Sequence, residues 1–147
     1  MNCIDNVKFE YNNIGKSDMS YINCAKQISI QTNHKHKIGC VIVSGHRIIG
    51  SGHNSDTKTV PLQAMLDSKH FQCECSGKVH AETEALLPFV RHHVSLAGAT
   101  IYTFRQRKDG TYGCARPCPR CMQVIKMVGI KKLVYTTNDG IAKEKLT

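Results

Sequence analysis

The chain lacks the features that would mark a membrane, secreted or repetitive protein. Tryptophan is absent, and no apolar run approaches the roughly 20 residues that a bilayer-spanning helix needs. Residues 1–5 show no basic start followed by an apolar stretch, which argues against a secretory signal. No internal repeat or low-complexity linker is found. We therefore expect a cytoplasmic protein that does not bind a membrane.

Acidic and aromatic residues are also few. Eleven Asp and Glu against 20 Lys and Arg give a formal charge of +9, which attracts polyanions from a nucleotide phosphate to nucleic acid. Aromatic residues make up only 6% of the chain, and the basic residues form no continuous stripe interleaved with them. A surface that binds a nucleic-acid strand needs both aromatic residues, which stack on the bases, and a basic stripe, which follows the phosphate backbone. A small nucleotide is therefore the favoured anionic partner, and simple solvation of the surface is the alternative reading of the charge.

The length and composition of the chain are those of one globular domain. Its 147 residues can bury a single core, and the hydrophobic share of 41% is that of an ordinary globular protein. We expect one domain over residues 1–147, with residues 1–16 as a polar lead-in segment. Inside a cell, the eight cysteines are expected to be thiols or metal ligands rather than a disulfide framework.

Hydrophobic periodicity predicts helices alternating with strands, which implies a mixed sheet packed between helices. The predicted helices cover residues 19–32 (capped by Ser17 or Asp18), 80–93 and 118–128. The predicted strands cover residues 38–43, 48–52, 99–104 and 131–136. Residues 53–79 are expected to form a long loop, residues 105–116 a charged insertion, and the tail after residue 138 a final helical turn.

Two short segments carry the residue types of a metal centre, His80-Ala81-Glu82 and Pro117-Cys118-Pro119-Arg120-Cys121. Cys118 and Cys121 are three residues apart, so on a helix their thiols face the same way. A helix N-terminus also stabilises thiolates. His80 and Glu82 would diverge within a regular helix, so both can face one metal only if the helix begins at His80 or Ala81.

The number of protein ligands indicates the kind of site. His80, Cys118 and Cys121 supply three, which leaves the fourth position of a tetrahedral zinc open to water, as in catalytic sites. Zinc lowers the pKa of bound water toward ~7, and Glu82 is then free to move protons. Alone, a Cys-x-x-Cys pair can be a redox motif or incidental, and a His-x-Glu means little. Their joint occurrence at two predicted helix starts predicts a catalytic Zn²⁺ site.

Together these residues match the H-x-E…P-C-x-x-C signature, and the chain resembles the zinc-dependent cytidine and deoxycytidylate deaminase superfamily from about residue 17 to 135. The resemblance implies a three-layer α-β-α sandwich with a mixed central sheet of about five strands. It also implies that Asn54, in Gly52-His53-Asn54, holds a sugar hydroxyl or the base. The backbone at Ala81 would bind the ring carbonyl, and the Pro117 carbonyl would receive the exocyclic amine.

The segment after the Cys118 helix, residues 129–135, most resembles the deoxycytidylate deaminases. In three respects the chain departs from them: residues 104–116 are longer than their usual link, Arg116 stands where a glutamate often precedes the proline, and the loop after Asn54 lacks their Gly-rich sequence. Arg105, Arg107, Arg116 and Arg120 are candidates to contact a substrate phosphate. Phe104 is a candidate to stack on a base, or else a core residue. Relatives commonly assemble, so a homo-oligomer is expected from the resemblance.

A second cluster, His70, Cys73 and Cys75, precedes the first. These residues could bind a second, structural zinc, with Cys114, Cys24 or His53 as a fourth ligand, because a long loop with little apolar content gains order from a metal. The alternative is a polar loop with idle thiols.

Three functions remain open at this point. The leading prediction is a hydrolytic deaminase that converts cytosine to uracil on a free nucleotide such as dCMP. The second is a deaminase that acts on cytosine or adenine within single-stranded DNA or tRNA, for which the charge of +9 is the argument. The third is a nonenzymatic zinc-binding module. The presence of Glu82 and of an open ligand position argues against it.

Overall fold

The computed structural model describes residues 14–33, 35–55 and 80–146. The elements in these residues follow in the order α1 (Lys16–Ser29), β1 (Lys37–Ser44), β2 (Arg47–His53), α3 (Ala81–Arg91), β3 (Thr100–Gln106), α4 (Pro119–Met127), β4 (Lys132–Thr137) and β5 (Gly140–Lys145). None of the described helices is long and apolar enough to span a membrane. Most of the predicted loop, residues 56–79, and most of the predicted lead-in, residues 1–13, lie outside the described residues.

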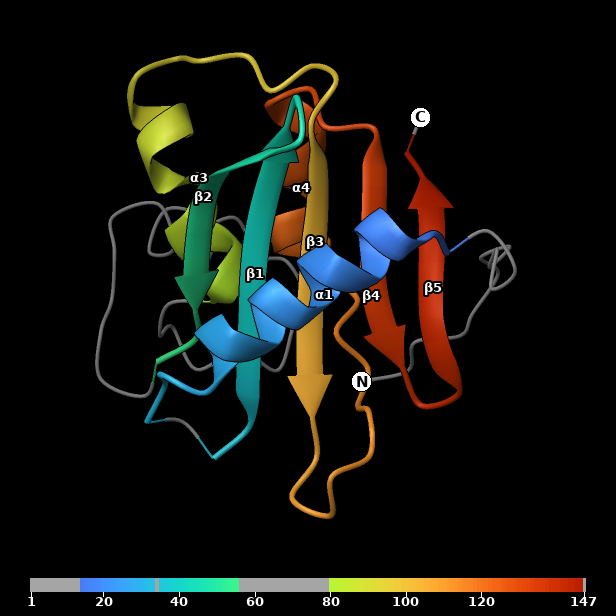
Figure 1. Cartoon of the computed structure of the whole chain (residues 1–147). Helices are drawn as coiled ribbons and strands as arrows, with labels where there is room; N and C mark the ends of the chain where they lie inside the picture. The colour runs from blue at the N-terminus through green and yellow to red at the C-terminus, as the bar shows by residue number, and fades with distance from the viewer. Residues whose placement is uncertain (1–13, 34, 56–79, 147) are drawn as a thin grey trace.

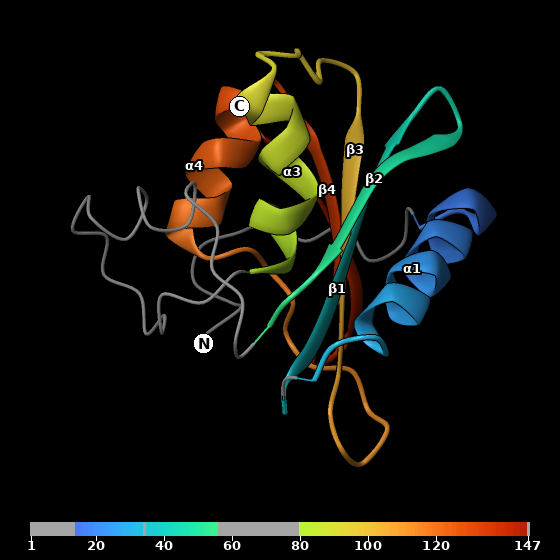
Figure 2. The same ribbon diagram turned by 90° about the vertical axis from the view of Figure 1, so that its left-hand side faces the viewer.

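The five strands form one mixed sheet in the order β2-β1-β3-β4-β5. β1 pairs antiparallel with both β2 and β3, β3 pairs parallel with β4, and β4 pairs antiparallel with β5. The parallel pair follows from the helix between its strands, because such a connection must cross the sheet. α1 lies on one face of the sheet, and α3 and α4 lie side by side on the other (Figures 1 and 2). The predicted three-layer α-β-α fold is confirmed.

Strand alternation divides the apolar core into two parts. Along β1, Cys40 and Ile42 belong to the cluster beneath α3 and α4, whereas Val41 and Val43 belong to the cluster beneath α1. All four side chains are buried, which explains why this strand is apolar without interruption. Helices therefore pack on both faces of β1, which fixes the position of this strand.

The tail is the element that sequence analysis predicted wrongly. Instead of a helical turn it forms β5, which pairs with β4 from Thr137↔Gly140 to Lys132↔Lys145. The connecting sequence Asn138-Asp139-Gly140 is a hairpin signal, and Gly140 has φ +141°, a value that favours glycine. The tail pairs because β4 would otherwise be an unprotected edge.

Two other boundaries differ from those predicted. α1 begins one turn earlier than expected, with Gly15 as its N-cap, and Asp18 sits at the third helical position, where its carboxylate accepts a hydrogen bond from the Gly15 N–H. The charged insertion is a hairpin that extends β3. In it Gln106 pairs with Tyr112, and the Arg107 N–H donates to the Thr111 carbonyl at 2.8 Å.

Two glycines allow α3 to lie close to β2. A Cβ atom on Gly52 would stand 2.4 Å from the Ala81 carbonyl oxygen and 2.7 Å from the Ala85 nitrogen, both backbone atoms that cannot move aside. At Gly50 the nearest atom, 3.0 Å away, is the far end of the Phe89 ring. Gly52 therefore sets the position of the first turn of α3.

We predict that Gly52→Ala lowers the free energy of unfolding by about 1–3 kcal/mol, the usual cost of overpacking. Gly50→Ala is the matched control on the same strand and should cost less, because the Phe89 ring can rotate and the nearest backbone atom, the Ala85 carbonyl oxygen, is 3.2 Å away. Urea unfolding of both variants measures the difference. Equal stability of the two variants would contradict the close approach of α3 at Gly52.

Candidate metal centre

His80 lies at the N-cap of α3, with an extended backbone at φ −87° and ψ 157°. This is the helix start that the spacing of His80 and Glu82 predicted. Thr83 fixes the cap, because its hydroxyl accepts a hydrogen bond from the His80 N–H at 3.1 Å and donates one to the His80 carbonyl at 2.9 Å. The break in helical geometry turns the imidazole toward the same side as the Glu82 carboxyl.

Cys118 and Cys121 lie at the start of α4. Cys118 is the N-cap, with φ −66° and ψ 165°, and Cys121 is the third helical residue. The predicted helix start at Cys118 is thus one residue early, and Pro119 rather than Cys118 opens the helix, where its missing N–H costs nothing. Both thiols are buried, at 5% and 0% exposure.

The chain that leads into α4 is pinned between two strands. The Thr103 hydroxyl of β3 donates to the Ala115 carbonyl at 2.7 Å, and the Ala115 N–H donates to the Thr136 carbonyl of β4 at 2.9 Å. Pro117 and Cys118 follow directly. Sequence analysis missed the positioning roles of Thr83 and Thr103. A threonine three residues after a predicted cap was the available signal for Thr83; none existed for Thr103.

The three ligand atoms lie together at the distances that zinc requires. His80 Nδ1 is 3.6 Å from Cys118 Sγ and 3.4 Å from Cys121 Sγ. Tetrahedral zinc with its ordinary Zn–N and Zn–S bond lengths places nitrogen and sulfur about 3.6 Å apart. Within the described residues this is the one group of three His, Cys, Asp or Glu ligands found close enough to hold a metal ion. The donor set therefore fits Zn²⁺.

Burial and hydrogen bonding divide the charge among these groups. A hydrogen bond from the Cys121 thiol lowers the pKa of Cys118 to about 4, although burial opposes the shift. The same hydrogen bond, together with burial, raises the pKa of Cys121 well above its usual range. Deprotonation of Cys118 is thus favoured over deprotonation of Cys121. A metal ion that binds both sulfurs displaces the remaining thiol proton.

Glu82 is the carboxyl next to this centre. Only 5% of the residue is exposed, and burial raises the pKa of the carboxyl despite the opposing effect of His80. The carboxyl also hydrogen-bonds with the Cys121 thiol. Cys40 of β1 lies near enough for the Glu82 charge to raise the pKa of its thiol further, after burial. A raised pKa makes this carboxyl a better proton acceptor than an ordinary glutamate, which suits a proton carrier beside a metal position.

Of the predicted substrate residues, Ala81 and Pro117 directly adjoin the candidate ligands His80 and Cys118 in the chain, and Asn54 follows β2, the strand against which α3 begins. Asn54 is buried, and its amide bridges two backbone groups: Oδ1 accepts from the Ile38 N–H at 3.1 Å, and Nδ2 donates to the His36 carbonyl. Each of these atoms keeps capacity for one more hydrogen bond. Ala81 opens α3, so its N–H is among the donors that a helix cannot satisfy from within.

Phe104 and Arg116 are not brought to the centre. Phe104 is 1% exposed and packs in the α1-side core, edge-on against Tyr112, because strand alternation turns it away from α3 and α4. Arg116 forms a two-pronged ion pair with Glu144 of β5 at 3.0 and 3.1 Å. The Tyr135 hydroxyl donates to the same carboxylate at 3.0 Å. Arg116 therefore anchors the Pro117 segment to β5.

The second predicted zinc site, His70, Cys73 and Cys75, lies outside the described residues and stays a prediction. Of its possible fourth ligands, Cys114 is disulfide-bonded, contrary to the expectation that the cysteines are thiols or ligands. Cys24 is a free thiol on α1, across the sheet from the metal centre. His53 has its Nδ1 3.0 Å from the Asn54 carbonyl oxygen.

A three-ligand His-Cys-Cys centre with an adjacent glutamate, built on two helix starts over a mixed sheet, defines a zinc-dependent nucleobase deaminase class. The chain matches the family described as the cytidine and deoxycytidylate deaminase zinc-binding region over residues 15–137, and it belongs to that family. Zn²⁺ is accordingly the metal of this family's site, and His80, Cys118 and Cys121 form a group that could hold it.

Relatives and solved structures agree with this assignment. The chain is 30% identical over 114 residues to the deoxycytidylate deaminase of Enterobacteria phage T2 and 31% identical to that of phage T4, which covers 78% of this chain in each case. It spans about half the length of these curated relatives, 55% and 53%. The fold resembles apo dCMP deaminase from the cyanophage S-TIM5, with a TM-score of 0.57 at 24% identity over 81% of both chains. It also resembles the cytidine deaminase of Burkholderia pseudomallei, with a TM-score of 0.60 at 16% identity over 86% of this chain and 91% of that one.

We predict that Cys121→Ser lowers the bound zinc by one equivalent relative to the parent protein, because serine replaces a buried thiolate ligand with a weak one. Cys24→Ser is the matched control, since it removes a free thiol on the opposite side of the sheet. Elemental analysis of both purified proteins measures the metal. Unchanged zinc in Cys121→Ser would exclude Cys121 as a ligand.

Proposed function

We propose that this protein is a zinc-dependent hydrolytic deaminase that converts cytosine to uracil on a free nucleotide, dCMP by preference. The observation that carries the proposal is the buried Glu82 carboxyl beside a centre of only three described protein ligands. A purely structural zinc site does not require a buried carboxylate that is not a ligand, and burying such a charge costs free energy. The proposal also accounts for the family to which the chain belongs.

His80, Cys118 and Cys121 would hold the metal, and two of the three stand at N-caps. When bound, Zn²⁺ acts as a Lewis acid that lowers the pKa of a coordinated water toward ~7 and so supplies a nucleophile near neutrality. The Ala81 N–H lies in the first turn of α3, where it can donate a hydrogen bond to the ring carbonyl of the base. Pro117 presents a carbonyl at the start of α4 for the exocyclic amine.

Glu82 performs the proton transfers. Its carboxylate takes a proton from the attacking water and gives it to N3 of the cytosine ring, while the water oxygen adds to C4. Glu82 then takes the second proton of that oxygen and delivers it to the amino group, which leaves as ammonia as the C4 carbonyl forms. The raised pKa of Glu82 suits both directions of transfer.

The choice of a free nucleotide rests on the relatives. The phage T2 and T4 proteins are deoxycytidylate deaminases, and one S-TIM5 structure is a complex with dCMP and dUMP. The described residues offer little support for a nucleic-acid strand, because the large aromatic side chains Phe104 and Tyr135 are buried and cannot stack on a base. Deamination within nucleic acid remains the competing function.

Glu82→Gln should abolish turnover, by at least the ~10²–10⁴-fold that a positioned proton carrier contributes, and leave zinc bound. Glu84→Gln is the control: it makes the same change on the same helix, but Glu84 points to the opposite side and accepts a hydrogen bond from the His53 N–H. Ammonia release and zinc content are measured for both. Near-full activity in Glu82→Gln would remove Glu82 from the mechanism.

The substrate class is tested with the zinc-loaded parent protein, which is offered dCMP, cytidine, guanine and a short single-stranded oligonucleotide. We expect ammonia release from dCMP and little from the oligonucleotide. Turnover of the oligonucleotide without turnover of the monomers would reverse the ranking of the two functions.

We also propose that the protein forms a homo-oligomer. Two adjacent isoleucines on the edge strand β2, Ile48 and Ile49, are 45% and 40% exposed, and such apolar surface is commonly covered by a partner. Light scattering coupled to size-exclusion chromatography measures the mass. A mass of one chain at micromolar concentration would contradict the proposal.

A further inference from the structure

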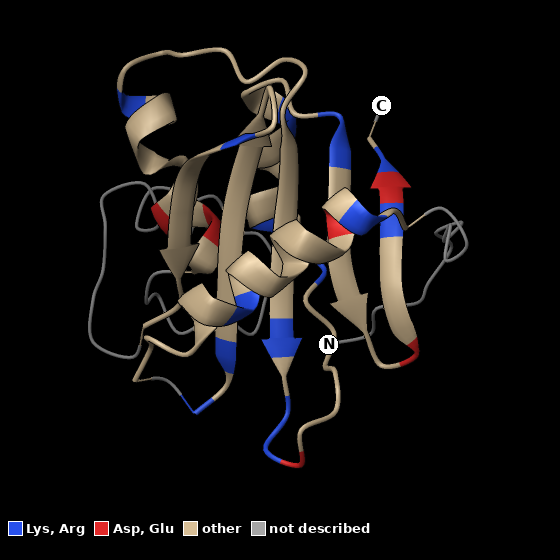
Figure 3. Ribbon diagram, in the orientation of Figure 1, with Lys and Arg blue, Asp and Glu red and all other residues tan. Residues whose placement is uncertain are grey.

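Several Lys and Arg residues lie at the end of the sheet where β1 begins and β3 finishes, and others lie at the opposite end (Figure 3). We call the first of these the basic end and define it by Lys35, Lys37, Arg105, Arg107 and Lys108. The only acidic residue in the same two segments, Asp109, is already engaged by the Thr111 backbone N–H at 3.0 Å and its hydroxyl at 2.6 Å. α3 and α4 both start toward this end, so the basic end lies on the metal-centre side of the fold (Figure 2).

Arg105 is the member of the basic end that faces the layer of the metal centre. Along β3 it shares a face with Ile101, which packs under α3 and α4, and with Thr103, which holds the chain before Cys118. Its partner across the sheet is Ile38, which packs against the same core.

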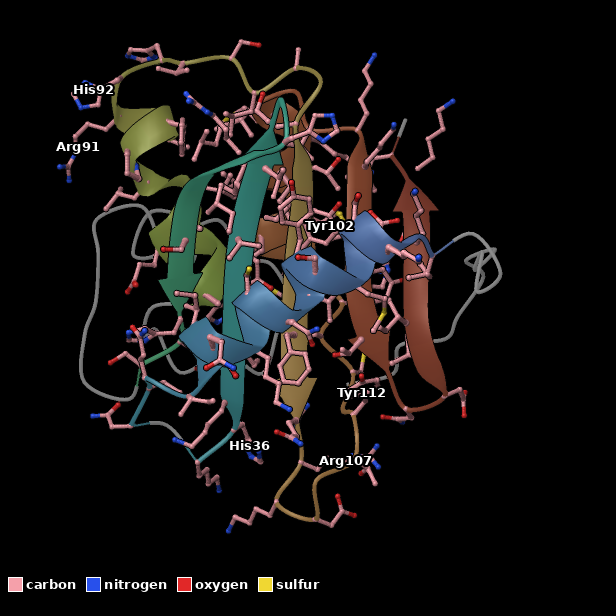
Figure 4. All side chains as sticks on the ribbon, viewed as in Figure 1. His36, Arg91, His92, Tyr102, Arg107 and Tyr112 are labelled. Carbon is pink, nitrogen blue, oxygen red and sulfur yellow. The ribbon has the colours of Figure 1, made fainter. Side chains whose placement is uncertain are left out.

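Asn54, the predicted sugar contact, is connected to Arg105 through His36. The Asn54 amide bonds to the Ile38 N–H and to the His36 carbonyl, and the His36 ring Nδ1 lies 3.4 Å from Arg105 Nη2. Asn54, His36 and Arg105 therefore form a continuous row of contacts. His36 and Arg107 lie at this same end of the molecule (Figure 4).

The Arg105 guanidinium is held in place without an acidic partner among the described residues. Its side chain packs on Gly113, where a Cβ atom would stand only 3.0 Å from Cδ and 3.1 Å from Nε. Burial and the nearby charge of Arg107 lower the pKa of the guanidinium. Both effects penalise the cation, and a bound dianion would offset both.

The other arginines considered from sequence are less suited to an anion. Arg116 is committed to Glu144, and Arg120 is 7% exposed on α4. Arg107 is exposed and donates to the Asn138 side chain. Arg105 alone among these four combines a fixed position, partial exposure and the metal-centre face.

We propose that Arg105, assisted by His36, binds the 5′-phosphate of the nucleotide substrate and so makes the enzyme select nucleotides over nucleosides. Arginine suits this task because its planar fork can donate two parallel hydrogen bonds to phosphate oxygens. The row runs from base to phosphate: Glu82 and the metal act on the base, Asn54 contacts the sugar, and Arg105 binds the phosphate. The inference rests on the proposed function and specifies the substrate of the same site.

The test compares dCMP with deoxycytidine, which differ only by the phosphate, in the zinc-loaded parent, Arg105→Gln and Arg105→Lys. We expect Arg105→Gln to lower kcat/KM for dCMP by roughly 10- to 100-fold, the loss of a charge-assisted hydrogen bond, and to leave deoxycytidine unchanged. Arg105→Lys should retain part of the preference, since it keeps the charge but not the fork. Zinc content and the deoxycytidine rate show that each variant is folded.

Arg107→Gln is the matched control, because it removes an equal charge from the same hairpin and leaves the Arg105 guanidinium and its contacts with His36 and Gly113 in place. An unchanged dCMP preference in Arg105→Gln, or an equal loss in Arg107→Gln, would overturn the assignment. Calorimetric binding of dCMP and deoxycytidine is measured in parallel. If the parent deaminates neither compound, the proposed function fails, and loss of the dCMP binding advantage in Arg105→Gln still decides the role of Arg105.

Discussion

The meeting of one imidazole nitrogen and two sulfurs at a single point constrains the rest of this structure. His80 Nδ1 lies within 3.6 Å of both thiols, although 38 and 41 residues separate them in the chain. Neither helix alone could supply this set. The sheet brings them together because α3 and α4 cross the same face and begin toward the same end, and Gly52 and Thr103 fix their first turns against β2 and β3.

Placing two ligands at N-caps gives the centre its chemistry as well as its shape. Unpaired backbone N–H groups at both helix starts favour the thiolate of Cys118 and leave donors at Ala81 for a bound base. The same region holds Glu82, whose carboxyl is buried near His80, Cys121 and Cys40. Metal ligation, substrate donors and proton transfer therefore depend on the same two turns of backbone, which makes the helix starts more critical than the helices that follow.

Local pattern was enough to predict the layers and the centre, because both are encoded within a few residues. The spacing of His80 and Glu82 required a helix start, and apolar alternation defined β1, β3 and β4. Features that depend on contacts between residues far apart in the chain could not be predicted from local pattern. β5 is a strand only because β4 needs a partner, and Arg116 is committed to Glu144, 28 residues further on. Phe104 is two residues from Tyr102 on the same strand, so strand alternation alone places both side chains on the α1 face of the sheet. His70, Cys73 and Cys75 stay untested.

The account rests on an open metal coordination, and crystallography of the zinc-loaded protein with anomalous scattering recorded at the zinc edge tests it most directly. We expect an anomalous peak between His80 Nδ1 and the sulfurs of Cys118 and Cys121, with a solvent molecule as the fourth ligand and Glu82 within hydrogen-bonding distance of it. No peak at this position, or a fourth ligand contributed by the protein, would contradict the account.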